Sequence, residues 1–111
     1  MKLEGWVGRP YLGEHYCRIF AAQLLAANGI QYPEHAQRPE DAEGWQRVEH
    51  GEPCDVVVFN RAGRPAHVGV CIGRGRFIHV ERGGRSRIES LTCLEWGGRI
   101  EGIYRCTGAP A

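Results

Sequence analysis

Apolar residues recur with a helical period in the first third of the chain. Cys17, Phe20 and Leu24 fall on one face of residues 15–28. This spacing predicts an amphipathic helix over that range. Gly29 suits the position just after a helix, where the backbone often turns left-handed. The apolar face of the expected helix therefore begins with a cysteine.

The second half of the chain alternates short apolar runs with turn residues. These runs are Asp55–Asn60, His67–Ile72, Phe77–Glu81 and Ile100–Cys106. Such runs predict antiparallel strands. In the polar segment before them, a short helix from about Pro39 to Val48 is compatible with proline in its first turn. The order of elements predicts an α+β fold, in which one helix packs on an antiparallel sheet within a single domain of residues 1–111.

The composition agrees with an ordinary globular domain. The chain has 111 residues, of which 42% are hydrophobic and 24% are charged. Its most apolar stretch, residues 19–30, is too short to cross a bilayer, so we expect no membrane partner. The first residues lack the apolar run of a secretory signal, so we expect the chain to be cytoplasmic on synthesis.

The charge is nearly balanced overall but uneven along the chain. A net charge of +1 gives no general reason to expect nucleic acid as a partner. Residues 61–87 nevertheless contain seven arginines and one acid, Glu81. A solvated surface is the simpler interpretation of this segment. A site for a carboxylate or phosphate is the alternative, because arginine binds these groups with two parallel hydrogen bonds.

Five cysteines, an odd number, occur in the chain without any Cys-x-x-Cys pair, so we expect reduced thiols. Cys54, Cys71, Cys93 and Cys106 lie among strand-like apolar residues, where cysteine packs as a small hydrophobic side chain. Cys17 differs because it lies at the expected start of the helix. There the partial positive charge of the first-turn N–H groups favours the thiolate, which predicts a lowered thiol pKa.

Two histidines flank the turn segment Gly73-Arg74-Gly75. If the hairpin loop has an odd number of residues, for instance three with Ile72 opposite Arg76, then Gly69 faces His79. His67 then lies diagonally adjacent to His79 on the same face of the sheet. A loop of two residues would place the two histidines on opposite faces.

We expect the apolar stripe of the helix to bring Cys17 to the face of the sheet that bears the histidines. Cys17, His67 and His79 would then supply the nucleophile, the base and the orienting group of a cysteine hydrolase. The simpler interpretation is that the cysteine belongs to the core and the histidines are structural. A zinc site made by the same three side chains is a further alternative.

The chain resembles the NlpC/P60 family of cysteine peptidases over nearly its full length, particularly the versions in bacteriophage tail tips. The matching segments are Val7-Gly8-Arg9-Pro10-Tyr11, Asn28-Gly29-Ile30 with Pro33, Asp55-Val56-Val57-Val58-Phe59, His67-Val68-Gly69-Val70 with Gly73 and Gly75, Phe77-Ile78-His79, Trp96, Arg99-Ile100 and Ile103-Tyr104-Arg105. The resemblance implies a papain-like core, with Cys17 opening the helix, His67 as the base and His79 orienting it. Tyr11 is similar to the tyrosine that lines the family's active site and would help to bind the oxyanion.

The activity implied by the resemblance is hydrolysis of an amide in the peptide stems of bacterial cell wall, typically between D-glutamate and a diamino acid. No metal or cofactor is implied. The expected partners are the peptidoglycan stem peptide and other proteins of a phage tail, with the virion tail as the place of action.

The sequence departs from the family pattern around the nucleophile. The family usually has Asp-Cys-Ser/Trp-Gly, where the acid helps to recognise a substrate amine, whereas this chain has Tyr16-Cys17-Arg18-Ile19. Three alternatives stay open: Glu14 replaces the missing acid in substrate binding, the site accepts another acyl compound, or the protein is a noncatalytic structural or binding component of a phage tail.

Overall fold

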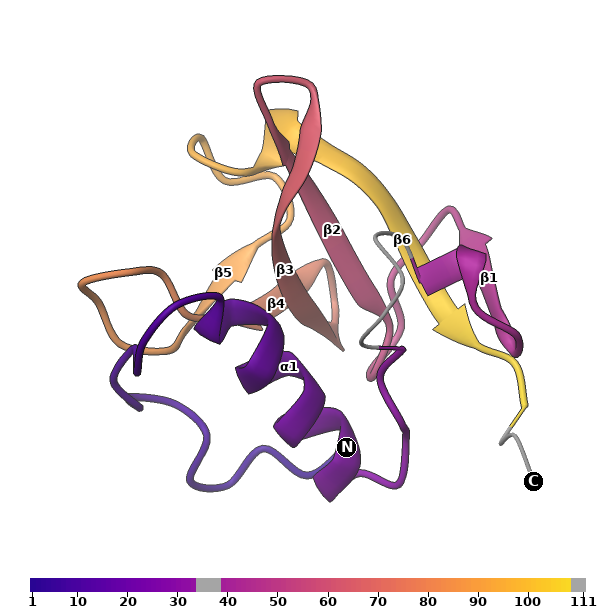
Figure 1. The fold of residues 1–111 in the computed structure, drawn as a ribbon, viewed down its shortest axis with the longest axis horizontal. Coiled ribbons are helices and arrows are strands. Elements are labelled where there is room, and N and C mark those ends of the chain that lie inside the picture. The colour runs from indigo at the N-terminus through magenta and orange to yellow at the C-terminus, as the bar shows by residue number, and fades with distance from the viewer. Residues whose placement is uncertain (34–38, 109–111) are drawn as a thin grey trace.

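One helix packs on a six-stranded sheet in the computed structural model, which describes residues 1–33 and 39–108 (Figure 1). The elements in chain order are α1 (Tyr16–Ala27), the 3₁₀ turn η1 (Pro39–Asp41), β1 (Trp45–Val48), β2 (Val56–Arg61), β3 (Arg64–Gly73), β4 (Arg76–His79), β5 (Arg87–Ser90), the 3₁₀ turn η2 (Gly97–Arg99) and β6 (Ile100–Cys106). The strands lie in the order β1-β6-β2-β3-β4-β5, and every neighbouring pair is antiparallel. The expected α+β architecture is confirmed. Within the described ranges, no helix is both long enough and apolar enough to span a membrane.

Helix α1 agrees with the predicted range to within one residue at each end. It stops where the N–H of Gly29 donates to the carbonyl of Ala26 and the N–H of Ile30 donates to the carbonyl of Leu25. This pair of bonds is the Schellman motif, which requires a left-handed residue after the helix. Gly29 provides it with a φ of 81°.

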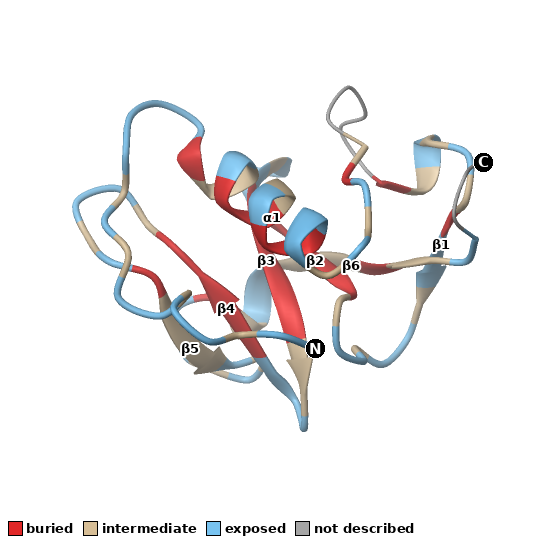
Figure 2. Cartoon of the chain, turned by 90° about the horizontal axis from the view of Figure 1, so that it is seen from below, coloured by how far each residue is buried: buried red, intermediate tan, exposed pale blue. Residues whose placement is uncertain are grey.

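The sheet separates two hydrophobic clusters. The buried face of α1 packs with the side chains of Val56, Val58, Val68, Val70 and Ile78 on one side of the sheet. Figure 2 shows the buried side of the helix turned toward β2 and β3. The other side carries Val57, Phe59, Cys71, Phe77, Trp96 and Ile103. Since successive residues of a strand point to opposite faces, each of the central strands serves both clusters.

The histidines belong to the second of these faces, away from α1. The ring of His67 contacts Phe59 and Trp96, and the ring of His79 contacts Phe77. The expectation that α1 packs on the histidine-bearing face is therefore wrong. The apolar stripe of α1 meets the valines of β3, which alternate with His67 and Cys71.

In the β3–β4 hairpin, His67 and His79 share one face of the sheet as expected, but the loop does not have the odd number of residues that was expected to place them there. The loop has two residues, Arg74 and Gly75, both with positive φ, as a type I′ turn requires. A two-residue loop alone would put the histidines on opposite faces, but the pairing shifts between Cys71 and Gly73 and leaves one extra residue in β3. This β-bulge restores the shared face, and the rings of His67 and His79 meet there.

Two short strands differ from the sequence-based expectations. Residues 39–48 were expected to form a helix, but only Pro39–Asp41 forms a helical turn and Trp45–Val48 is a strand. Strand β1 pairs with β6, and β5 pairs with β4 over four residues. Strand β1 is determined by a partner far away in the sequence, and β5 by its pairing with the preceding strand, so local propensity identifies neither.

The alignment of the hairpin depends on Gly69. A Cβ atom at this position would lie 2.7 Å from Cδ2 of Phe77 and 3.4 Å from Cβ of His79. We expect Gly69→Ala to lower the free energy of unfolding by about 1–3 kcal/mol, because it overpacks the contact between β3 and β4. Urea unfolding measures the change. Gly98→Ala is the matched control, since nothing lies within 4 Å of its Cβ position. Equal stability of the two variants would contradict this account of the hairpin.

Candidate active site

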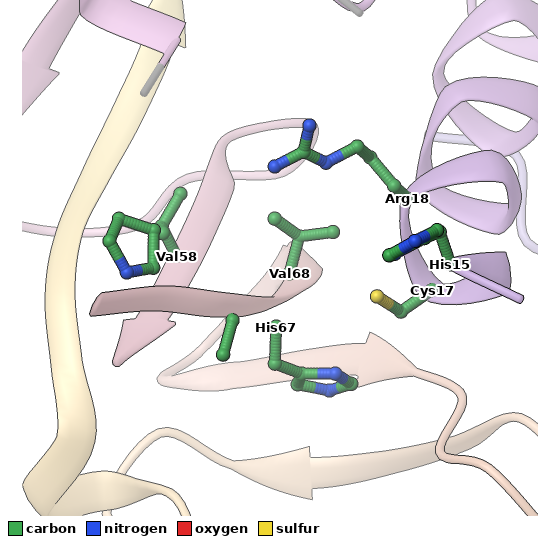
Figure 3. Close-up of a pocket in the computed structure, with 8 residues that line it drawn as sticks. His15, Cys17, Arg18, Val58, His67 and Val68 are labelled. Carbon is green, nitrogen blue, oxygen red and sulfur yellow. The ribbon is translucent and has the colours of Figure 1, made fainter. Parts of the chain in front are cut away.

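A pocket of about 600 Å³ opens between the start of α1 and the first half of β3. Its lining residues are His15, Cys17, Arg18, Val58, Pro65, Ala66, His67 and Val68. Figure 3 shows Cys17 at the end of the helix, with its sulfur turned toward the strand that carries His67 and Val68. Two of the three expected catalytic side chains thus share one pocket, although α1 and the imidazole of His67 lie on opposite faces of the sheet.

The short length of β4 explains how this arrangement is possible. Strand β3 begins at Arg64, but β4 pairs with it no further than Val70 opposite Ile78. The first half of β3 therefore extends beyond its neighbour. Cys17 lies beside this stretch, where it lines the pocket together with Pro65 and Val68. Cys17 and His67 thus both line the pocket at this end of the sheet.

The first turn of α1 has one N–H group without an acceptor. The N–H of Tyr16 donates to the hydroxyl oxygen of Tyr11 at 3.1 Å, and the N–H of Arg18 donates to the carbonyl of His15. Among the described residues, the N–H of Cys17 has no acceptor. The Tyr11 hydroxyl, which accepts from Tyr16, keeps its own proton to donate. The N–H of Cys17 and the hydroxyl of Tyr11 are therefore two candidate donors for an oxyanion.

The thiol of Cys17 is not activated by its position at the helix start. Burial raises its pKa above the ordinary value, although hydrogen bonding by the backbone of Val68 and Arg18 acts in the opposite direction. The expected lowering of this pKa is wrong, because removal of the thiolate from water outweighs the stabilising N–H groups. The resting side chain is a neutral thiol.

His67 is a neutral base with one ring nitrogen fixed. Its Nε2 lies 2.7 Å from Nδ1 of His79, and its ring stacks on Trp96 with centroids 4.4 Å apart. Nδ1 of His67 has no hydrogen-bond partner in the described part of the chain. Burial lowers the pKa of His67 to about 3, and the neighbouring His79 acts in the same direction. The free Nδ1 is thus the atom that can accept a proton.

Behind the histidines lies a chain of ionic groups that sequence reasoning missed. Nε2 of His79 lies 2.5 Å from Oε2 of Glu89, and this oxygen is 3.2 Å from Nε of Arg87. Arg87 also pairs with Glu81 at 2.5 Å, and Glu81 accepts the indole N–H of Trp96 at 2.9 Å. The alternation of β5 could have indicated Glu89 and Arg87, but only after β5 itself was recognised.

The same cluster is the only candidate metal site within the described residues. Ligand atoms of His79, Glu81 and Glu89 lie within 4.8 Å of one another. The guanidinium of Arg87 pairs with both carboxylates and takes the place that a cation would need. The alternative zinc site of Cys17, His67 and His79 is disfavoured, because the two histidines use facing nitrogens for each other. The side chains that are present do not fit a metal.

The expected substrate-binding residues have different positions relative to the pocket. Tyr11 lies against the start of α1, where its ring contacts Tyr16 edge to face, but it is not among the residues that line the pocket. Glu14 is exposed and does not line the pocket. Arg18 does line it, and no carboxylate among the described residues pairs with its guanidinium. The charge that the pocket presents is therefore positive.

We expect the depressed pKa of His67 to make the stability of the protein depend on pH. Between about pH 6.5 and pH 3 the unfolded chain binds a proton at His67 that the folded chain does not bind, so the free energy of unfolding falls as the pH falls. One such proton contributes a slope of about 1.4 kcal/mol per pH unit. Urea unfolding at several pH values should give a shallower dependence for His67→Gln. The exposed control His50→Gln should keep the wild-type dependence, and equal slopes for all three proteins would contradict the burial argument.

Solved structures with the same fold come from several organisms. An NlpC/P60 family protein from Bacillus cereus has a TM-score of 0.75 at 21% identity, over 93% of this chain and 37% of that one. An NLP/P60 family protein similar to a lipoprotein, from Staphylococcus aureus, has a TM-score of 0.73 at 19% identity, over 94% and 38%. The NlpC/p60 domain of the peptidoglycan hydrolase SagA has a TM-score of 0.64 at 19% identity, over 90% and 89%. The chain thus spans less than two fifths of the first two proteins.

At these identities the similarity establishes the fold alone. No curated protein matches the sequence. The model of the NlpC/P60 family matches residues 8–105, a range that includes the whole pocket and the cluster of His79, Glu89 and Arg87 behind it. With this match over most of its length, the chain belongs to the NlpC/P60 family.

Proposed function

We propose that this protein is a cysteine peptidase or amidase that hydrolyses an amide bond in the peptide stems of bacterial cell wall. The observation that carries the proposal is that Cys17 and His67 line one pocket, and that Nδ1 of His67 has no hydrogen-bond partner among the described residues. The fold of the NlpC/p60 domain of the peptidoglycan hydrolase SagA, a solved domain of which this chain covers 89%, supports cell wall as the substrate.

The reaction begins with a neutral thiol and a neutral imidazole. Nδ1 of His67 takes the thiol proton while the sulfur of Cys17 attacks the carbonyl carbon of the amide. No hydrogen bond joins the two side chains in the described structure, so substrate binding has to bring them together. Catalytic contacts of this kind are often long in the absence of substrate.

The attack moves the carbonyl electrons onto oxygen. The N–H of Cys17 and the hydroxyl of Tyr11 lie at the start of α1, where they stabilise the oxyanion together with the helix dipole. The C–N bond then breaks, and the leaving amine takes its proton from Nδ1 of His67. Water, deprotonated by the same nitrogen, hydrolyses the thioester and restores the thiol of Cys17.

Substrate recognition should depend on Arg18. Its guanidinium lines the pocket one residue after the nucleophile, and no carboxylate among the described residues pairs with it. Stem peptides carry free carboxylates beside their amide bonds, and a guanidinium binds a carboxylate with two parallel hydrogen bonds. We therefore assign to Arg18 the recognition of an anionic acyl group. This role differs from that of the acid that precedes the cysteine elsewhere in the family.

The setting that we propose is the tail of a phage particle, with synthesis in the cytoplasm and other tail proteins as partners. Support for this setting comes only from the sequence resemblance to phage tail-tip members of the family. The second candidate function is that of a noncatalytic tail component, which is favoured by the unusual residues around Cys17. We expect virions to carry this protein at the tail in a form that cleaves stem peptides. An inactive protein that is still needed for assembly would favour the second function.

We expect Cys17→Ala to abolish the release of new amines from purified peptidoglycan or stem peptides. Loss of a covalent nucleophile costs on the order of 10⁴ to 10⁶ in rate. His67→Ala should be nearly as damaging, whereas His79→Ala should be milder because His79 only supports the base. Cys93→Ala, outside the pocket, is the matched control and should keep wild-type activity. A folded wild type that cleaves no stem peptide over a broad pH range would contradict the proposal.

We expect Arg18→Gln to raise KM for a carboxylate-bearing stem peptide by roughly tenfold or more, the equivalent of one lost charged hydrogen bond. For a peptide in which that carboxylate is amidated, Arg18→Gln and the wild type should have the same KM. Steady-state kinetics on the two peptides measure both effects. Arg76→Gln, an exposed arginine on β4, is the control. An unchanged KM for the acidic peptide would exclude Arg18 from recognition.

A further inference from the structure

We propose that Glu89 is a positioning residue that sets the tautomers of both His79 and His67, and thereby leaves Nδ1 of His67 free as the catalytic base. The assignment of tautomers rests on the geometry behind the pocket. Only its catalytic consequence rests on the proposed function.

The first step is the contact between Glu89 and His79. Oε2 of Glu89 lies 2.5 Å from Nε2 of His79, whose side chain is fully buried. A carboxylate only accepts hydrogen bonds, so Nε2 of His79 must carry the proton. In a neutral imidazole the other nitrogen then has no proton. Nδ1 of His79 is therefore an acceptor.

The second step passes this assignment to His67. Nδ1 of His79 lies 2.7 Å from Nε2 of His67, and one of these two nitrogens has to donate. Because Nδ1 of His79 is the acceptor, Nε2 of His67 carries the proton and Nδ1 of His67 does not. Burial lowers the pKa of both rings, so each is neutral and has a single proton to place. The carboxylate of Glu89 thus determines whether Nδ1 of His67, two imidazole rings away, carries a proton.

The third step is the fixation of Glu89 itself. Nε of Arg87 lies 3.2 Å from the same oxygen that accepts from His79, and Nη2 of Arg87 lies 2.5 Å from Oε1 of Glu81. Glu81 accepts the indole N–H of Trp96, whose ring stacks on His67. The contacts therefore form a closed circuit that includes the base. Its six side chains are those of His67, His79, Glu89, Arg87, Glu81 and Trp96.

An ordinary surface ion pair is the simpler interpretation of Glu89, since β5 is an edge strand and Glu89 pairs with Arg87. Two observations favour the positioning role. The carboxylate is only partly exposed, and the short contact is made to a fully buried ring nitrogen. Glu95, by comparison, reaches Arg87 at 4.0 Å with half of its side chain exposed and has no contact with a histidine.

Nitrogen NMR of the two imidazoles tests the inference directly. In the wild type at pH 7, both rings should be in one tautomer, with the proton on Nε2 and none on Nδ1. Glu89→Met keeps the length of the side chain but has no acceptor for the buried N–H of His79. We expect it to populate the opposite tautomer at His79 and, because the two rings share one hydrogen bond, at His67 as well.

Two further variants separate this effect from a general loss of structure. Glu89→Gln retains a carbonyl acceptor and should restore much of the wild-type tautomer pattern. Glu95→Gln removes the other acid beside Arg87 and should leave both rings unchanged. Wild-type nitrogen shifts at His67 and His79 in a folded Glu89→Met protein would overturn the proposal. So would equal changes in Glu89→Met and Glu95→Gln.

Kinetics add the catalytic consequence. Glu89→Met should lower kcat by roughly ten- to a hundredfold with little change in KM, as is typical when a group that orients a catalytic residue is lost. Unchanged kcat together with altered tautomers would remove the catalytic part of the inference. If the wild type itself cleaves no stem peptide, the proposed function fails. The tautomer assignment is judged in that case by the NMR alone.

Discussion

The hydrogen bond between the imidazoles of His67 and His79 links the architecture of the sheet to the chemistry of the pocket. It requires the two side chains on one face of the β3–β4 hairpin, and a two-residue loop alone would separate them. The bulge between Cys71 and Gly73 corrects the alignment, and Gly69 leaves the space in which the rings approach. Because a shift by one residue would turn every side chain of a strand to the other face, the site depends on this single irregularity.

Burial has opposite consequences for the two groups that the proposed reaction needs. It lowers the pKa of His67 to about 3 and raises the pKa of Cys17, so that both are neutral in the resting protein. A thiolate–imidazolium pair would cost free energy in the folded protein, because two charges would be removed from water. The neutral state avoids this cost, and proton transfer is left to the moment of attack. A neutral imidazole carries its single proton on one of two nitrogens, so the tautomer decides which nitrogen can act as the base. Glu89 acts through this choice of tautomer.

Arg18, unlike the buried residues of α1, takes no part in the hydrophobic core. The stripe of α1 and the valines of β2 and β3 hold the helix in place, whereas Arg18 faces the pocket from the same helix. The residue after Cys17 can therefore be cationic without a change in the packing of α1. Under the proposed function, Arg18 alters recognition while Cys17 and His67 serve as nucleophile and base, as expected when function lies in sites carried by a common fold.

Local pattern in the sequence was sufficient for α1, the Gly29 cap, the strands β2, β3, β4 and β6 and the alternation that puts His67 and Cys71 on one face, because these features depend on neighbouring residues. The candidate nucleophile and histidines were also recognisable, through their resemblance to a family. The face covered by α1, the strands β1 and β5, the bulge and the role of Glu89 were decided only by tertiary structure. The position of α1 and the strand β1 depend on contacts between distant segments. Strand β5, the bulge and the contact of Glu89 join nearby segments, but they depend on strand register and side-chain packing that local pattern does not encode. The raised pKa of Cys17 is also a tertiary effect, since burial by the assembled fold outweighs the local field of the helix.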